Sequence, residues 1–119
     1  MLSLDDIVNQ RDWDALRALH LDSEKFTKFG SGSQRQGFDE MIAEEIAAAS
    51  AARDVSIDQR NLKIDVFGDV AVATCTPLFS FTNAEDEAVK LEARSTMVWV
   101  KTVDGWKIAH EHNSPLDTP

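Results

Sequence analysis

The clearest pattern of apolar and polar positions lies in residues 91–114, LEARSTMVWVKTVDGWKIAHEHNS. β-Branched and aromatic residues crowd both halves of this segment, and no proline interrupts it. Between the halves stands Asp104-Gly105, a pair that suits a tight turn because glycine accepts positive φ angles. The pattern therefore predicts a β-hairpin, and this hairpin carries most of the candidate site residues.

The first half of the chain has the periodicity of helices. Ser3 is a suitable cap for a short helix, and Asp12 is a suitable cap for a second one that ends near His20. We expect His20 to be a partly exposed terminal residue rather than a ligand. The longest helix is predicted over residues 38–53, with one apolar stripe. Glu45 borders that stripe, either as a solvated residue or as a pocket carboxylate.

Strands dominate the rest of the chain. Residues 24–29 alternate polar and apolar side chains, so a short strand is expected there, followed by a turn or mobile flap over residues 30–37. Residues 55–67 and 70–82 are predicted to be strands joined by a turn at Gly68-Asp69.

Pro77 lacks a backbone donor, so a bulge or an unpaired edge is expected at that position. Helices followed by an antiparallel meander indicate the α+β class, with the helices packed on one face of the sheet. The length of 119 residues fits a single domain over residues 1–119.

Both faces of the predicted strands carry apolar residues. An antiparallel sheet covered by helices on one side normally has one face in water. We therefore expect the second face to contact another copy of the chain, as a homodimer. The even-numbered residues assigned to this face are Leu62, Ile64, Val98, Val100, Trp106 and Ile108, together with Arg94, His110 and His112.

Composition limits the possible partners. Asp and Glu number 21 against 12 Lys and Arg, which gives a net charge of -9. Such a surface repels nucleic acid and anionic lipid, so neither nucleic acid nor a membrane is expected as a partner. No apolar run approaches the length of a membrane span, and the N-terminal residues lack the pattern of a signal peptide. The single cysteine, Cys75, suits the cytoplasm.

Four segments together resemble a known family: RDWDAL, a helix that a glycine opens, GDVAVATC, and STMVWVKTVDGWKIAHEHNSP. They resemble the SnoaL-like branch of the NTF2-like superfamily, and also the association domain of calcium/calmodulin-dependent protein kinase type II. The resemblance covers nearly the whole chain. It implies an NTF2-like cone, in which a curved antiparallel sheet wraps around N-terminal helices, and usually a dimer. It also implies a pocket between helices and sheet.

This resemblance assigns the odd-numbered face to the pocket. Its predicted lining is mostly apolar, which suits a small hydrophobic molecule and requires no cofactor. The residues assigned to it are Cys75, Pro77, Met97, Trp99, Glu111 and Asn113, with Met41 from the helix above.

Two mechanisms of the family do not carry over. The arginines that bind carboxylates in the kinase association domain correspond to Pro77, Met97 and Asn113, so an anion clamp is not supported. The tyrosines on which ketosteroid isomerases and scytalone dehydratase of this fold rely have no equivalent, because the chain contains no Tyr.

Glu111 is the main candidate for chemistry. A carboxylate in an apolar cone has a raised pKa and can act as a general acid or base. In the alternative interpretation, Glu111 lies at the rim, hydrated or paired with Arg94 or Lys107. Asn113 has two open roles as well, holding a ligand carbonyl or fixing the end of the strand.

A metal site and a cysteine nucleophile are both disfavoured. His110 and His112 share one strand face, but a zinc site needs further ligands, so hydrogen-bonded histidines at an interface are expected instead. Alternation places Cys75 on the opposite face from both histidines, which favours a small core cysteine.

Two classes of function remain. The first is a dimeric domain that binds a small molecule in an apolar pocket. The alternative is a pocket enzyme of the isomerase, cyclase or dehydratase type, which acts by proton transfer on a small hydrophobic substrate through Glu111.

Overall fold

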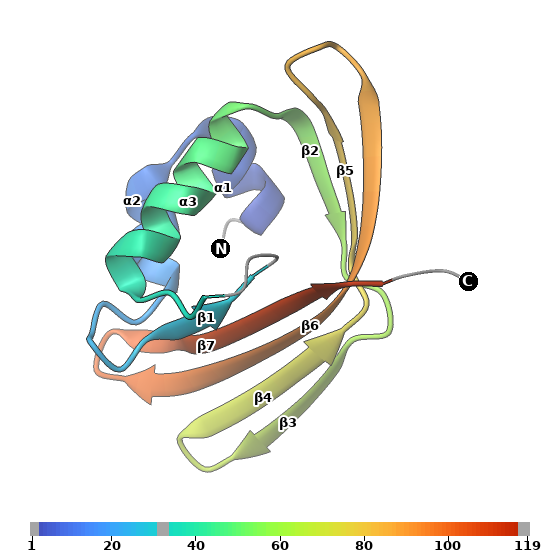
Figure 1. The fold of residues 1–119 in the computed structure, drawn as a ribbon. Coiled ribbons are helices and arrows are strands. Elements are labelled where there is room, and N and C mark those ends of the chain that lie inside the picture. Colours follow the sequence, from blue (N-terminus) through green and yellow to red (C-terminus); the bar gives the residue numbers. More distant parts are fainter. Residues whose placement is uncertain (1–2, 31–33, 117–119) are drawn as a thin grey trace.

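A computed structural model describes residues 3–30 and 34–116 of the chain. The helices precede most of the strands, as expected for the α+β class (Figure 1). The elements in chain order are α1 Leu4–Gln10, α2 Trp13–Leu19, β1 Thr27–Phe29, α3 Phe38–Ser50, β2 Arg53–Asp58, β3 Lys63–Phe67, β4 Val70–Cys75, β5 Leu78–Thr82, β6 Ala88–Thr102 and β7 Gly105–Pro115.

The strands form one curved sheet that does not close into a barrel. Its main path is β1-β7-β6-β4-β3, and β5 and β2 continue from the other half of β6. β6 pairs with β4 through residues 95–100 and with β5 through residues 88–92, so the sheet bends where this strand changes partner. The helices lie inside the bend, with β3 far from them (Figure 1). The β1–β7 pair is parallel, so the sheet is mixed rather than wholly antiparallel.

Two predicted strands are each divided in two. Residues 55–67 become β2 and β3, with a turn before Lys63, and residues 70–82 become β4 and β5. Pro77 lies at the second break, where its missing N–H interrupts pairing as expected. Its carbonyl still accepts a hydrogen bond from the Ala93 N–H at 3.1 Å. Of the predicted turn over residues 30–37, residues 31–33 lie outside the described residues.

The helix starts follow the predicted capping. The Ser3 hydroxyl accepts a hydrogen bond from the Asp6 N–H, and the Asp12 carboxylate accepts one from the Ala15 N–H at 3.1 Å. These bonds satisfy donors that the first turn of a helix leaves without partners. None of the described helices is long and apolar enough to cross a membrane.

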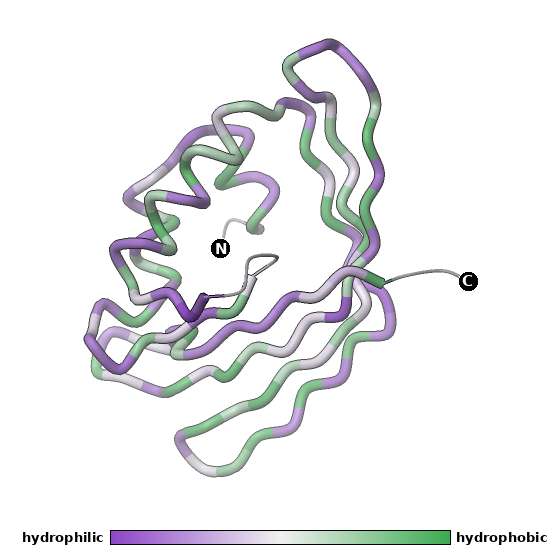
Figure 2. Tube along the Cα trace, viewed as in Figure 1, coloured by the Kyte–Doolittle hydropathy of each residue, from purple (hydrophilic) through white to green (hydrophobic). Residues whose placement is uncertain are grey.

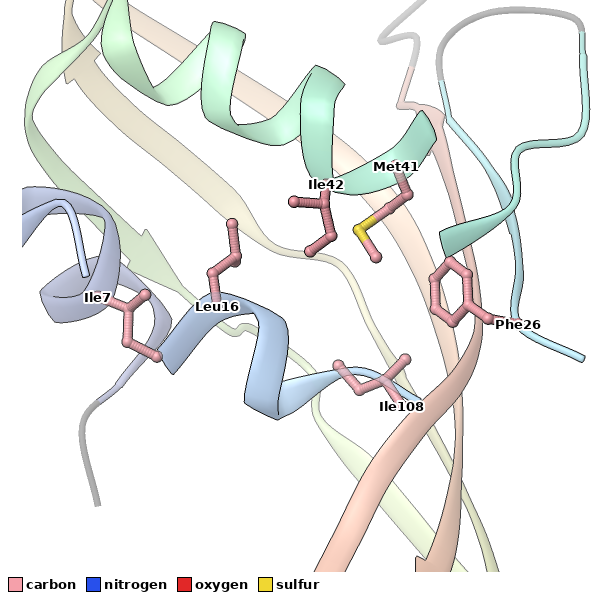
Figure 3. Close-up of a cluster of buried hydrophobic side chains, with 6 residues drawn as sticks. All are labelled: Ile7, Leu16, Phe26, Met41, Ile42 and Ile108. Atoms are coloured by element: carbon pink, nitrogen blue, oxygen red, sulfur yellow. The ribbon is translucent and has the colours of Figure 1, made fainter. Parts of the chain in front are cut away.

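The core lies where the helices meet the first residues of β7, around Ile108. It consists of buried side chains from α1, α2, α3, β7 and the segment before β1 (Figure 3). They are Ile7, Leu16, Phe26, Met41, Ile42 and Ile108. Burial of these side chains fixes the helices against one end of the sheet only.

The strand register corrects the assignment of residues to the two sheet faces. Thr102 pairs with Gly105 across a two-residue turn, and such a turn places even residues of one strand opposite odd residues of the other. Trp106 and Ile108 therefore lie on the inner face with Trp99, and Ile108 is buried rather than part of an outer contact. The prediction had wrongly placed Trp106 and Ile108 on the outer face.

A β-bulge restores the expected alternation further along β7. The register shifts between Val98 and Trp99, so that β7 holds one extra residue, and Met97 then pairs with Glu111. The same two-residue turn rule reverses β3, where Ile64 pairs with the inner-facing Ala73. Ile64 was therefore also wrongly assigned to the outer face.

Truncating Phe26 tests this description of the core. Phe26 is 1% exposed, whereas Val103 at the hairpin tip is 102% exposed. Phe26→Ala is expected to lower the free energy of unfolding by about 3–5 kcal/mol through lost burial and a residual cavity. The control Val103→Ala is expected to stay within about 0.5 kcal/mol of the parent chain. Urea unfolding measures both, and equal small effects would contradict this core.

Candidate functional site

A cavity of about 880 Å³ lies between the inner face of the sheet and the helices. Six of the predicted pocket residues line it: Cys75, Pro77, Met97, Trp99, Glu111 and Asn113. Met41 does not line it, because its side chain is fully buried in the core (0% exposed). The register explains this common lining, since Met97 and Glu111 are cross-strand partners and Ser95 and Asn113 are the next pair on the same face.

Much of the remaining wall is apolar and was not predicted as pocket lining. It comes from α1, from the last turn of α3 and the segment after it, and from β2, β5 and β6. These residues are Leu4, Val8, Ala48, Ala52, Val55, Ile57, Phe79, Phe81 and Leu91. Alternation along β2 and β5 is the signal that could have indicated Val55, Ile57, Phe79 and Phe81, which lie at alternate positions of these strands. What the sequence did not reveal is that β2 folds over the cavity, because β2 and β3 had been taken as one strand.

Glu111 lies deep in the cavity and is buried. Its carboxylate accepts a hydrogen bond from the Asn113 side-chain amide at 3.1 Å and lies 3.2 Å from His20 Nε2. Lys28 Nζ is 3.7 Å from its second oxygen. The alternative interpretation, in which Glu111 lies at the rim with Arg94 or Lys107 as partner, is therefore wrong. Asn113 fixes the carboxylate as well as lining the cavity.

His20 is 3% exposed, which contradicts the expectation of a partly exposed helix end. The chain turns after α2 and joins the edge of β7, where the Leu21 N–H donates to the Ile108 carbonyl at 2.8 Å. This contact carries the His20 ring into the cavity beside Phe26, with a ring-centroid distance of 5.7 Å. His20 was missed because its position depends on a contact between distant segments.

Lys28, which is buried, and Glu45, which is half-buried, complete an ionic cluster with His20 and Glu111, hereafter the ionic cluster. Lys28 Nζ lies 2.9 Å from Glu45 Oε1, and parallel pairing of β1 with β7 places Lys28 beside Glu111. Of the two alternatives for Glu45, the pocket carboxylate is therefore the correct one. Lys28 was not predicted as a site residue, although it lies two positions after the buried Phe26 and therefore points to the same side.

The ionic cluster favours charged forms of its members. His20 Nδ1 lies 2.8 Å from the Leu16 carbonyl oxygen, and Nε2 faces Glu111, so both neighbours accept hydrogen bonds. The ring satisfies both only as an imidazolium. Burial lowers the pKa of His20, but the Glu111 hydrogen bond and the Glu45 charge outweigh burial and raise it.

The same contacts act on Glu111 in the opposite direction. Burial raises the pKa of Glu111, but the His20 hydrogen bond and the Lys28 charge dominate and lower it to about 2. The expectation of a raised pKa is therefore wrong, because the apolar walls are not the nearest neighbours of this carboxylate. Lys28 likewise has a raised pKa, since Glu111 and Glu45 outweigh its burial.

The ionic cluster has the donor set of a metal site but holds its own cation. Among residues 3–30 and 34–116, one group of three potential ligands is found, in which atoms of His20, Glu45 and Glu111 lie within 4.8 Å of one another. The Lys28 ammonium lies between the two carboxylates and supplies the positive charge that a metal ion would bring.

His110 and His112 lie on the outer face of the sheet. Thr27 Oγ1 and His110 Nδ1 are 2.8 Å apart, and Phe29 packs against both imidazoles. Cys75 is buried in the cavity wall, and burial raises the pKa of its thiol, which does not favour a nucleophile.

The model of the SnoaL-like domain family matches residues 3–118 of the chain. The chain belongs to the SnoaL-like domain family. A search of curated proteins found no match to it.

Solved structures support the same fold for this SnoaL-like domain. A proposed dehydratase of the NTF2-like family from Streptomyces avermitilis superimposes with a TM-score of 0.83 at 20% identity, covering 94% of this chain and 87% of that one. An NTF2-like superfamily protein from Salmonella enterica gives 0.81 at 19% identity, with coverages of 95% and 84%. A proposed calcium/calmodulin-dependent protein kinase II association domain from Xanthomonas campestris gives 0.80 at 15%, with coverages of 97% and 81%.

The low pKa of Glu111 makes a prediction about stability and pH. The pKa falls from 4.5 to about 2 on folding, so ionised Glu111 stabilises the SnoaL-like domain above pH 4.5 and this contribution is lost as the pH falls towards 2. The shift corresponds to about 3 kcal/mol. His20 acts in the opposite sense, because its raised pKa stabilises the fold at low pH and the contribution is lost as the pH rises through the folded value.

We therefore expect Glu111→Gln to destabilise the domain at pH 7 and to flatten the fall in stability between pH 4.5 and 2. The control Glu85→Gln removes a carboxylate from an exposed loop and should leave the curve unchanged. Denaturant unfolding at several pH values measures this. Parallel curves for both variants would show that Glu111 has an ordinary pKa.

Proposed function

We propose that this SnoaL-like domain binds a small, mainly apolar molecule in the inner cavity, with a polar group of that molecule against the ionic cluster. The observation that carries the proposal is the combination of largely apolar walls with the ionic cluster in a cavity of about 880 Å³. Cavities of this size and lining are typical of small-molecule sites, in which apolar contacts provide affinity and a few polar groups fix orientation.

Charge balance within the ionic cluster narrows the ligand. The two cationic side chains, His20 and Lys28, face the two carboxylates, Glu45 and Glu111. A free carboxylate on the ligand would compete with these carboxylates for the same cations, so a neutral hydroxyl, carbonyl or amide suits this end better. Asn113 offers an amide for such a group.

The second candidate function is proton transfer within the same cavity. It is favoured by the His20–Glu111 pair, in which a carboxylate orients an imidazole as in many acid–base sites. With a pKa of about 2, Glu111 is a weak base, so His20 is the proton donor and Glu111 its positioning partner. A molecule that co-purifies and stays chemically unchanged during incubation supports binding, whereas conversion that depends on His20 supports the enzyme.

We also propose that the chain forms a homodimer through the outer face of the sheet. Phe67 is 66% exposed and Val70 37% exposed on this face, and the register places Val72, Val98 and Val100 beside them. Figure 2 shows apolar residues along β3 and β4, which are the strands farthest from the helices. A two-fold axis buries the same patch on each copy.

The buried free thiol of Cys75 fits a reducing compartment, and we propose the cytoplasm.

Filling the cavity tests the binding proposal. Ala48 lines the cavity, whereas its neighbour Ala47 on α3, which is also exposed, does not. Ala48→Phe is expected to weaken binding of Nile red, a neutral apolar dye, at least about tenfold because the new ring takes its space. Ala47→Phe is the matched control and should bind as the parent chain does. Fluorescence titration measures both, with mass spectrometry under native conditions to detect a co-purified molecule. Equal affinities would exclude the cavity as the dye site.

A charge on the outer face tests the dimer. Val98→Glu is expected to yield monomers or aggregates, because a carboxylate without a partner is costly to bury in an interface. Val103→Glu adds the same charge at the hairpin tip, where the residue is 102% exposed, and should leave the assembly unchanged. Sedimentation at micromolar concentration measures the mass. A monomeric parent chain would contradict the proposal.

A further inference from the structure

A second hollow lies on the outer face of the sheet, directly behind the inner cavity. It measures about 390 Å³, and Cys75 and Ser95 belong to the walls of both hollows. Thr96 and Arg94 flank Ser95 along β6 and point to the opposite face from it, because side chains alternate along a strand. The outer hollow is therefore separated from the inner cavity by the thickness of the sheet alone.

The register builds this hollow from two rows of polar side chains. Thr74, Thr96 and His112 are cross-strand neighbours on β4, β6 and β7. Arg94 and Ser114 form the next row, where β6 leaves β4. Asn61 and Thr76 close the side at the break between β4 and β5. The outer hollow thus combines hydroxyl groups, a guanidinium and an imidazole on one face of the sheet.

The charge of this lining is opposite to that of the molecule as a whole. The chain has a net charge of -9, yet none of the residues lining the outer hollow is an Asp or a Glu. No ion pair links Arg94 to another residue within 3–30 and 34–116. The neighbouring charges are Glu92, two residues before Arg94 on β6, and Lys63, which is paired with Asp65 at 3.0 Å.

We propose that the outer hollow binds a phosphate group, either as inorganic phosphate or at the end of a small phosphomonoester. The guanidinium of Arg94 offers a planar fork of N–H donors that matches phosphate oxygens. The hydroxyls of Thr74, Thr96 and Ser114 add donors, and the absence of carboxylates from the lining removes competing acceptors. A volume of about 390 Å³ leaves room for a small organic group beyond the phosphate.

This site is independent of the proposed function of the inner cavity. It lies on the other face of the sheet, and its first row begins where the apolar residues Val72 and Val98 of the outer face end. The apolar and the hydroxyl-bearing parts of that face are therefore adjacent but distinct. Loss of phosphate binding would leave the binding of an apolar molecule in the inner cavity unaffected.

The test is an NMR titration of the full chain with inorganic phosphate and, separately, with glycerol phosphate, at an ionic strength held constant with sodium chloride. Shifts are expected to concentrate on the amides of Thr74, Arg94, Thr96 and Ser114. Arg94→Gln is expected to weaken binding at least about tenfold, and Thr96→Val, which keeps the side-chain shape, about two- to tenfold. The matched control is Arg53→Gln, which removes one exposed arginine, paired with Asp86, on the distant strand β2.

The outcomes separate the two sources of phosphate from a general charge effect. Tighter binding of glycerol phosphate assigns the hollow to a phosphomonoester, and equal binding assigns it to the free anion. Equal weakening by Arg94→Gln and Arg53→Gln would overturn the proposal, as would shifts scattered over the surface. Retained affinity in both Arg94→Gln and Thr96→Val would overturn it too.

Discussion

The ionic cluster ties the helices to the sheet through charged side chains, beside the backbone contacts that the same segments make. His20 and Glu111 are separated by 91 positions in the sequence, and Lys28 and Glu45 by 17. The four side chains come from the end of α2, from β1, from α3 and from β7. Because His20, Lys28 and Glu111 are buried, removal of one member of the cluster leaves the charge of another uncompensated away from water. The attachment of the helices to the sheet therefore depends on charge pairing as well as on the apolar core.

The ionic cluster also makes one part of the cavity highly charged, whereas most of the remaining wall is apolar. The apolar core closes the near end, and β2 folds over the far end, so the inner surface is apolar almost throughout. The four charges of the ionic cluster lie where β1 runs parallel to β7, whereas Ser3, Asp5 and Gln59 line the cavity elsewhere. The ionic cluster would therefore be the main charged contact for a molecule in the cavity.

The order of helices and strands predicted the α+β class, and the family resemblance assigned the odd-numbered face, with six of the lining residues, to the pocket. Alternation along each strand showed which side chains share that face. It failed wherever pairing between strands decided the outcome. Ile64, Trp106 and Ile108 were misplaced because a two-residue turn exchanges even and odd positions between the paired strands. Met41 was correctly predicted on the apolar stripe of the longest helix. It was wrongly predicted to line the cavity, because the stripe alone does not show which of its residues the other helices cover.

The chemistry of the site was less accessible to sequence reasoning. Glu111 was found as an inward carboxylate, yet its pKa was predicted in the wrong direction, because the shift depends on His20 and Lys28. Neither residue belongs to a local motif with Glu111. Their proximity follows from the parallel β1–β7 pairing and from the turn after α2, which are long-range contacts that spacing along one segment does not encode.

The extra residue in β7 has a consequence for how the final hairpin finds its register. A three-residue turn over residues 103–105, with no bulge, would still set Glu111 opposite Met97, because the number of intervening residues is the same. The two arrangements differ only at the tip, where the second would turn Trp106 and Ile108 to the outside. Ile108 is 3% exposed and fills the core between α2 and α3, so its burial selects the bulged arrangement over this near-equivalent one. The burial of one apolar side chain, Ile108, thus selects the register at the hairpin tip. The pairing of Met97 with Glu111 is the same in both arrangements.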